Sequence, residues 1–97
     1  MLVVIATVPG QPAHAEAIVA ALAECAAASR KDPGCRSYVF TTDVEDANSY
    51  ASIETWDDQA SLDAHMQQPH TQKLLAVIGD KVAGAPVITT YEVSEVR

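Results

Sequence analysis

The sequence predicts an α+β domain with the element order β-α-β-β-α-β. Three observations predict it. A β-branched run opens the chain, an alanine-rich helical segment follows, and two neighbouring alternating strands precede a second helical region and a last strand. The chain has 97 residues, which is the length of one domain, so residues 1–97 are expected to fold as a unit.

The first half of the order begins with a strand at residues 2–8, LVVIATV. Its apolar side chains point to both faces, which indicates a strand covered on both sides. Pro9 and Gly10 end it, and Pro12 suits the first turn of a helix over residues 12–30. The buried face of that helix is predicted by residues that recur at three- and four-residue steps: Ala15, Ile18, Leu22, Cys25 and Ser29.

The second half follows the turn signal of residues 32–34, DPG. Strands are predicted at residues 36–43 and 48–56, and the short connection at 44–47 favours a hairpin. Asp57 or Asp58 can cap a helix that runs to about Met66. Pro69 interrupts it, a further helix covers residues 70–79, and the last strand covers 86–95.

This order fits the ferredoxin-like split βαβ plan, an antiparallel four-stranded sheet with helices on one face. The plan leaves the other sheet face bare. If that face is apolar, something must bury it, and a second subunit is the simplest cover. We therefore expect a homodimer.

Charge and composition exclude several function classes. Thirteen acidic residues against six basic ones give a net charge of −7, which repels phosphate backbones and anionic lipid. No apolar run reaches the roughly 20 residues of a membrane span, and the first residues have no basic segment typical of a signal peptide.

The two cysteines, Cys25, predicted mid-helix, and Cys35, predicted in a loop, lack C-x-x-C spacing and are expected to be reduced thiols. We expect a cytoplasmic protein that binds neither nucleic acid nor membrane.

Aromatic side chains gather on one face of the two central predicted strands. Alternation places Tyr50, Ser52, Glu54 and Trp56 together on one face of residues 48–56. On the preceding strand the same rule groups Tyr38, Phe40 and Thr42. A carboxylate among aromatic rings is costly unless it has a partner, so Glu54 is expected to have one.

His65 is the candidate partner of Glu54. It falls on one helical stripe with Leu62 and Met66, and that helix must pack near the end of the strand that carries Glu54. A Glu54–His65 pair in an apolar cleft could supply a base that works near neutral pH. The alternative is that the pair is a polar contact that only stabilises the core.

The other histidines are less informative. His70 follows Pro69, and it could donate to a substrate oxygen at the pocket edge or simply cap the helix start. His65 and His70 are five residues apart with a proline between them, which does not place two ligands on one helical face. We therefore expect no metal site, and His14 is expected at the surface.

Residues 53–70, IETWDDQASLDAHMQQPH, contain E-x-W, then A-x-L-x-x-H, then P-H. This combination, together with the Pro33-Gly34-Cys35 turn and the element order, resembles the antibiotic biosynthesis monooxygenase (ABM) superfamily over nearly the whole chain. The resemblance is closest to its quinol-monooxygenase-like branch. It implies a dimeric α+β barrel in which two four-stranded sheets pack face to face, with a pocket in each subunit between sheet and helices.

The resemblance also implies a chemistry and a set of roles. Similar members use neither flavin nor metal, because a deprotonated hydroquinone or anthrone can itself reduce dioxygen. On this chain His65 would be the base or a hydrogen-bond partner of the substrate oxygen, and Glu54 would orient it. The walls for a flat quinone-like ligand would be Trp56, Tyr50, Tyr38 and Phe40, with His70 at the rim.

Departures from relatives narrow the expectation. Haem-degrading relatives use a histidine where residues 74–76 are LLA here, and an amide on the first strand that is absent from residues 2–8. Polyketide-tailoring relatives have an asparagine where Ser52 stands. A related branch handles a phosphorylated sugar, which suits a −7 protein poorly. Two other functions stay open: an isomerase or tautomerase acting on a small carbonyl compound, and a non-catalytic ligand-binding dimer.

Overall fold

The computed structural model describes residues 1–97, and it has the predicted order of strands and helices. The strands are β1 (Leu2–Pro9), β2 (Cys35–Asp43), β3 (Asp46–Trp56) and β4 (Val87–Glu92). The helices are a 3₁₀ turn, η1 (Pro12–His14), and α1 (Ala15–Ser29), α2 (Gln59–Met66) and α3 (Pro69–Ile78). The first helix thus begins as a 3₁₀ turn, Cys35 opens β2 rather than lying in a loop, and β4 is shorter than predicted.

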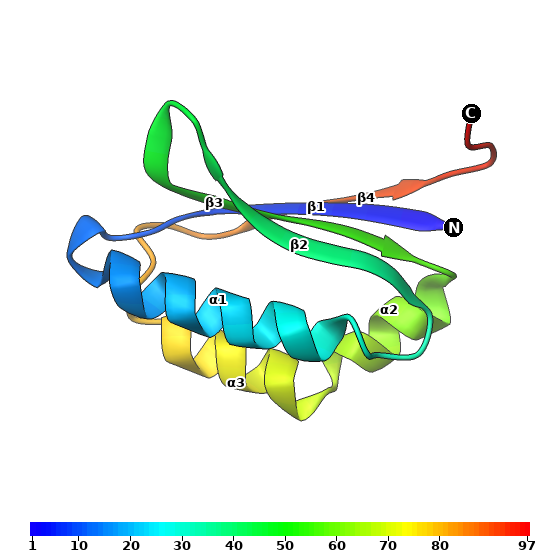
Figure 1. Cartoon of the computed structure of the whole chain (residues 1–97), viewed down its shortest axis with the longest axis horizontal. Coiled ribbons are helices and arrows are strands. Elements are labelled where there is room, and N and C mark those ends of the chain that lie inside the picture. Colours follow the sequence, from blue (N-terminus) through cyan, green and yellow to red (C-terminus); the bar gives the residue numbers. More distant parts are fainter.

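The four strands form one sheet in the order β2-β3-β1-β4, and each neighbouring pair is antiparallel. All three α-helices lie on one face of it, with α1 and α3 side by side (Figure 1). This is the predicted ferredoxin-like arrangement. The central strands β1 and β3 pair from Leu2 opposite Trp56 to Pro9 opposite Ser49.

The sheet face that meets the helices is the aromatic one, whose residues alternation groups together. Tyr50, Ser52, Glu54 and Trp56 are all buried, whereas Ile53, on the opposite face of the same strand, is 41% exposed. Two clusters of buried residues form the core on this face. One contains Leu2, Val4, Ala26, Tyr38 and Trp56, and the other Ile18, Leu22, Cys25, Tyr50 and Leu74.

A close approach at Gly10 holds one end of this core together. A Cβ atom on Gly10 would lie 2.6 Å from the ring of Tyr50 and 2.8 Å from the side chain of Ile18. Neither neighbour can move freely because both are almost fully buried. The turn after β1 therefore needs glycine in order to let α1 and the Tyr50 ring pack beside it.

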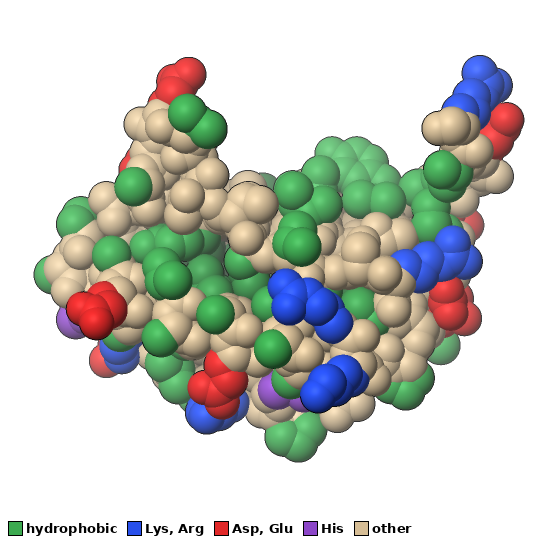
Figure 2. All heavy atoms as spheres, viewed as in Figure 1, with side chains coloured by type: hydrophobic (Ala, Val, Ile, Leu, Met, Phe, Trp, Pro, Cys, Tyr) green, Lys and Arg blue, Asp and Glu red, His purple; other side chains and the backbone are tan.

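The opposite face of the sheet carries no helix. Its exposed apolar side chains come from all four strands: Ile5, Val39, Ile53, Val87 and Tyr91. Figure 2 shows hydrophobic side chains projecting on the side of the sheet away from the helices. The expectation that residues 2–8 are covered on both faces is therefore wrong for the single chain, in which β1 is covered only on the helix side. None of the helices is long and apolar enough to cross a bilayer.

Candidate active site

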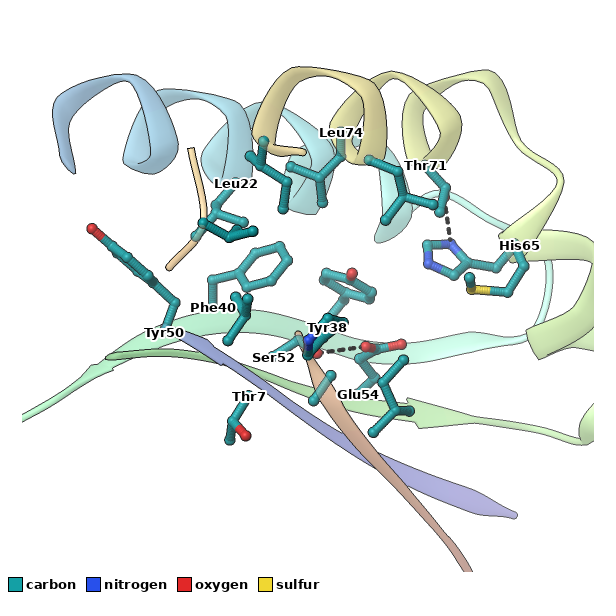
Figure 3. A pocket seen from close by; sticks show the side chains of 18 of the residues that line it. Thr7, Leu22, Tyr38, Phe40, Tyr50, Ser52, Glu54, His65, Thr71 and Leu74 are labelled. Atoms are coloured by element: carbon teal, nitrogen blue, oxygen red, sulfur yellow. Dashed lines mark hydrogen bonds between the residues drawn. The ribbon is translucent and has the colours of Figure 1, made fainter. Parts of the chain in front are cut away.

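A cavity of about 220 Å³ lies between the sheet and the helices. Its lining comes from all four strands and all three α-helices, and most of it is hydrophobic (Figure 3). An apolar cavity of about 150 Å³ can hold a benzene molecule. This cavity therefore has room for a flat molecule somewhat larger than one ring.

Glu54 lies in the cavity wall with both carboxylate oxygens engaged. The Ser52 hydroxyl donates to Oε2 at 2.7 Å, and the Trp56 indole N–H donates to Oε1 at 3.0 Å. Positions two apart on a strand share a face, which is why β3 supplies both donors itself. Glu54 thus has the polar partners that its burial requires, and they stabilise the carboxylate form.

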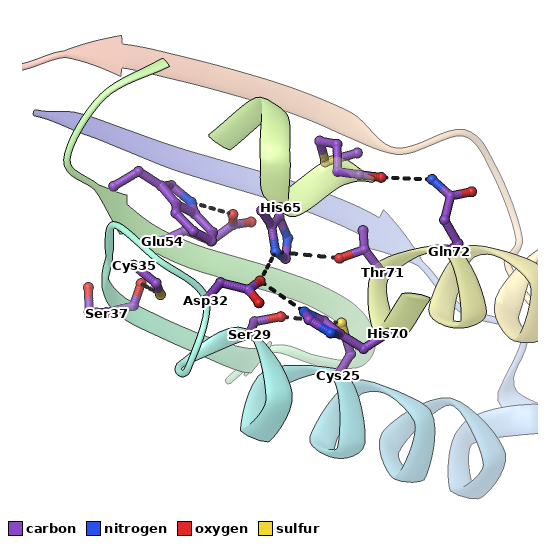
Figure 4. A network of polar contacts seen from close by, with 12 residues as sticks. Cys25, Ser29, Asp32, Cys35, Ser37, Glu54, His65, His70, Thr71 and Gln72 are labelled. Carbon is purple, nitrogen blue, oxygen red and sulfur yellow. Dashed lines mark hydrogen bonds and ion pairs between the residues drawn. The ribbon is translucent and has the colours of Figure 1, made fainter. Parts of the chain in front are cut away.

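His65 is bound by a different carboxylate from the one expected. Its Nδ1 lies 2.8 Å from Oδ2 of Asp32, and no hydrogen bond or ion pair joins it to Glu54 (Figure 4). The predicted Glu54–His65 pair is therefore wrong as a direct contact. The physical reason is that the turn between α1 and β2 carries Asp32 to the end of α2, while β3 already provides donors for Glu54. Both Glu54 and His65 nevertheless line the same cavity.

The contact with Asp32 fixes which ring nitrogen of His65 can act in the cavity. An ionised carboxylate accepts hydrogen bonds only, so the Nδ1 that faces Asp32 carries the proton. This assignment leaves Nε2 as an acceptor. Nε2 has no hydrogen-bond partner in the chain and is not fully enclosed. The arrangement of His65 is that of a general base held by a buried carboxylate.

His70 does not contact the cavity, in contrast to its expected position at the rim. Its Nε2 lies 2.9 Å from the same oxygen of Asp32, and its ring lines a separate groove between α1 and α3. His70 lies in the first turn of α3, which begins at Pro69, and its ring meets the α1–β2 turn at Asp32. His70 therefore holds Asp32 rather than a ligand.

Asp32, His65 and His70 form a group whose ligand atoms lie within 4.8 Å of one another, close enough to consider a metal ion. Two bonds of about 2.0–2.1 Å at a tetrahedral ion separate the ligand atoms by roughly 3.3 Å. Here both imidazole nitrogens approach one oxygen at 2.8 and 2.9 Å, which is hydrogen-bond spacing. Two imidazole N–H groups that donate to one carboxylate oxygen account for these contacts without a metal ion. The spacing of the two histidines did not predict this group. The break between α2 and α3 brings both imidazoles to the carboxylate of Asp32.

Trp56 supports the site from behind instead of forming a cavity wall. Its side chain is fully buried, and its ring centroid lies 4.6 Å from that of His65. Together with its hydrogen bond to Glu54, this contact fixes both groups that line the cavity. The predicted wall residues Tyr38, Phe40 and Tyr50 do line the cavity, and Trp56 does not.

The Tyr38 hydroxyl is a further polar group in the cavity. Burial raises the pKa of this phenol well above its ordinary value, and the negative charge of Glu54 raises it further. Tyr38 therefore stays protonated at any working pH. The hydroxyl also lies within hydrogen-bonding range of the Cys25 thiol, a weak partner that a ligand oxygen in the cavity can replace.

Asp32 and the donor role of Ser52 are the functional features that the sequence patterns did not reveal. The DPG segment indicated a turn and nothing more. A backbone hydrogen bond from Asp57 to the carbonyl of Gly34, at 2.8 Å, ties this turn to the start of α2. Asp32 is an acidic residue in a turn at the end of the sheet where β3 leads into α2. Its place there was the available signal that it could bind His65.

Comparison with protein families gives one match, to the family described as antibiotic biosynthesis monooxygenase, over residues 1–77. Among curated proteins, sll1783 from Synechocystis sp., itself uncharacterized, is 35% identical over 69 residues. That alignment covers 71% of this chain but 47% of the relative. The chain thus spans about half the length of the curated relative that it matches.

Solved structures share the fold over almost their whole length. A crystal structure described as an antibiotic biosynthesis monooxygenase superposes with a TM-score of 0.93 at 25% identity, covering 98% of this chain and 100% of that one. PA3566 from Pseudomonas aeruginosa has a TM-score of 0.87 at 30% identity, covering 96% and 94%.

Proposed function

Because the chain belongs to the antibiotic biosynthesis monooxygenase family, we propose that it is a cofactor-independent monooxygenase for a quinol-like or polycyclic phenolic substrate. One observation carries the proposal: Asp32 holds Nδ1 of His65, which leaves Nε2 as the free ring nitrogen beside an apolar, aromatic-lined cavity. The family match supports an oxygenase, and the lining supports a flat aromatic ligand.

In the proposed reaction His65 removes a proton from a substrate hydroxyl. Asp32 stabilises the imidazolium that forms, and the Tyr38 hydroxyl donates to the substrate oxygen. The resulting anion is electron-rich enough to reduce dioxygen. One oxygen atom enters the ring and the other leaves as water, so 1,4-naphthohydroquinone plus O₂ gives 2-hydroxy-1,4-naphthoquinone plus H₂O. The substrate supplies all four electrons, and the chain's own work is to deprotonate, orient and exclude water.

The proposal includes a homodimer formed through the open sheet face. Ile5, Val39 and Ile53 lie exposed on that face, and a second copy would bury them and complete a barrel of two sheets. Light scattering should give twice the mass of the chain, and Ile53→Lys should yield monomer. A monomeric wild-type protein at micromolar concentration would contradict this assembly. The unpaired state of Cys25 and Cys35 suits a reducing compartment such as the cytoplasm.

The test is oxygen uptake with a panel of hydroquinones in chelator-treated buffer. His65→Ala should lower kcat/KM by roughly 10²–10⁴-fold, the usual contribution of a general base. His14→Ala, which changes a histidine in η1 outside the cavity, is the matched control and should keep full activity. Uptake that is unchanged in His65→Ala would remove this residue from the mechanism. Product that forms equally well without oxygen would favour the isomerase, and binding without turnover would favour the ligand-binding dimer.

A further inference from the structure

Charge is distributed very unevenly around the cavity. None of the chain's six lysine and arginine side chains lines it, whereas Glu54 does, at 5% exposure. Asp32 adds a second carboxylate directly behind the His65 ring. A ligand in the cavity therefore meets negative charge with no cation to offset it.

The basic side chains are also held away from the cavity by their own partners. Arg36 pairs with Asp57, and Lys73 pairs with Glu24. Arg30 donates to the backbone carbonyl of Tyr38, and Lys81 donates to that of Val77. No cation close to the cavity is free to turn inward.

The contacts of Glu54 are those of a group that only accepts hydrogen bonds. Both of its oxygens accept hydrogen bonds, from Ser52 at 2.7 Å and from Trp56 at 3.0 Å. A carboxylate accepts at both oxygens without any change in these contacts. The acidic side chain of Glu54 therefore lies against the ligand with no cation beside it.

We propose that Glu54 is a specificity-determining residue that admits uncharged aromatic ligands and rejects anionic ones. The inference rests on the proposed function in that the cavity is taken to be the substrate site. Two charges about 8 Å apart at an effective dielectric constant of about 20 repel enough to weaken binding roughly 30-fold. Carboxylated, sulfonated and phosphorylated aromatics of otherwise suitable shape are therefore excluded as substrates.

The test compares two ligands that differ only in charge, naphthalene-2-carboxamide and naphthalene-2-carboxylate. Neither is oxidised, so titration calorimetry near pH 8 measures binding alone. The wild-type protein should bind the amide at least tenfold more tightly than the carboxylate. Glu54→Gln should reduce this ratio to about threefold or less. Glu45→Gln removes the same charge from the exposed β2–β3 turn and should leave the ratio unchanged.

A second variant keeps the test decisive if Glu54→Gln unfolds. Leu75 lines the cavity yet is 49% exposed, so Leu75→Lys places a cation at the mouth without disturbing the core. It should raise carboxylate affinity and leave amide affinity within about threefold. Equal affinities in the wild type, a ratio that neither variant changes, or failure of both ligands to bind would overturn the inference. A protein that shows the predicted ratio of amide to carboxylate affinity but no oxygen uptake would instead contradict only the proposed function.

Discussion

Replacing Asp32 by asparagine separates the role of its charge from the role of its shape. In the native chain one carboxylate oxygen accepts an N–H from His65 at 2.8 Å and another from His70 at 2.9 Å. An asparagine has one acceptor oxygen and a donor NH₂ group. If the NH₂ group faces His65, the imidazole must carry its proton on Nε2, and the acceptor that faces the cavity is lost.

The size of the effect follows from these contacts. A general base contributes roughly 10²–10⁴-fold, and in serine proteases a base held in the wrong tautomer loses about 10⁴-fold. We therefore expect Asp32→Asn to lower kcat by roughly 10²–10⁴-fold. The Asp32 side chain is only 7% exposed, and a hydrogen bond to a charged group contributes about 1.5–3 kcal/mol. Losing the charge should cost about that much free energy of unfolding.

The assay combines steady-state oxygen uptake with urea unfolding followed by circular dichroism. Asp63→Asn, an exposed position on α2, makes the same chemical change away from the site and should alter neither measurement. If Asp32→Asn keeps kcat within a factor of three and the free energy of unfolding within about 0.5 kcal/mol, then the charge of Asp32 does not fix the tautomer of His65.

Three further predictions concern stability and reactivity. Hydrogen bonds from the backbone and hydroxyl of Ser61 lower the pKa of Asp58, so its contribution to stability is present above about pH 4 and is lost as pH falls through its folded pKa. Urea midpoints should therefore fall less steeply in acid for Asp58→Asn than for the wild type, and parallel curves would contradict this. Burial raises the pKa of the Cys25 thiol, so iodoacetamide near pH 8 should label it only after denaturation, and rapid labelling of folded protein by mass spectrometry would refute the packing. Gly10→Ala forces a methyl group against the Tyr50 ring and should cost about 1–3 kcal/mol in urea unfolding, whereas a neutral result would mean that the turn can shift.

The sequence predicts the fold well because its signals are local and agree with one another. The alternation in residues 48–56 alone places Glu54 and Trp56 on one face of the sheet, and both are buried. The stripe on the first helix likewise predicts the burial of Ile18 and Leu22. Neither prediction needs to know how distant segments meet.

The site is harder to predict because its key contact is non-local. Asp32 and His65 are 33 residues apart, and only the packing of the α1–β2 turn against the end of α2 brings them together. The sequence correctly predicts that both Glu54 and His65 face the cavity. The predicted pairing of Glu54 with His65 is wrong, because strand alternation carries no information about a carboxylate in a loop such as Asp32. The position of His70 is predicted wrongly for the same reason, since its ring contacts the same loop carboxylate, Asp32.

The proposed role of His65 as a base depends most directly on which nitrogen of its ring is protonated. Long-range ¹H–¹⁵N correlation spectra of the folded protein near pH 8, assigned with His65→Gln, report which ring nitrogen bears the hydrogen. We expect hydrogen on Nδ1, facing Asp32, and an unprotonated Nε2 toward the cavity. Hydrogen on Nε2 would contradict it, because the cavity would then hold a donor in place of a base.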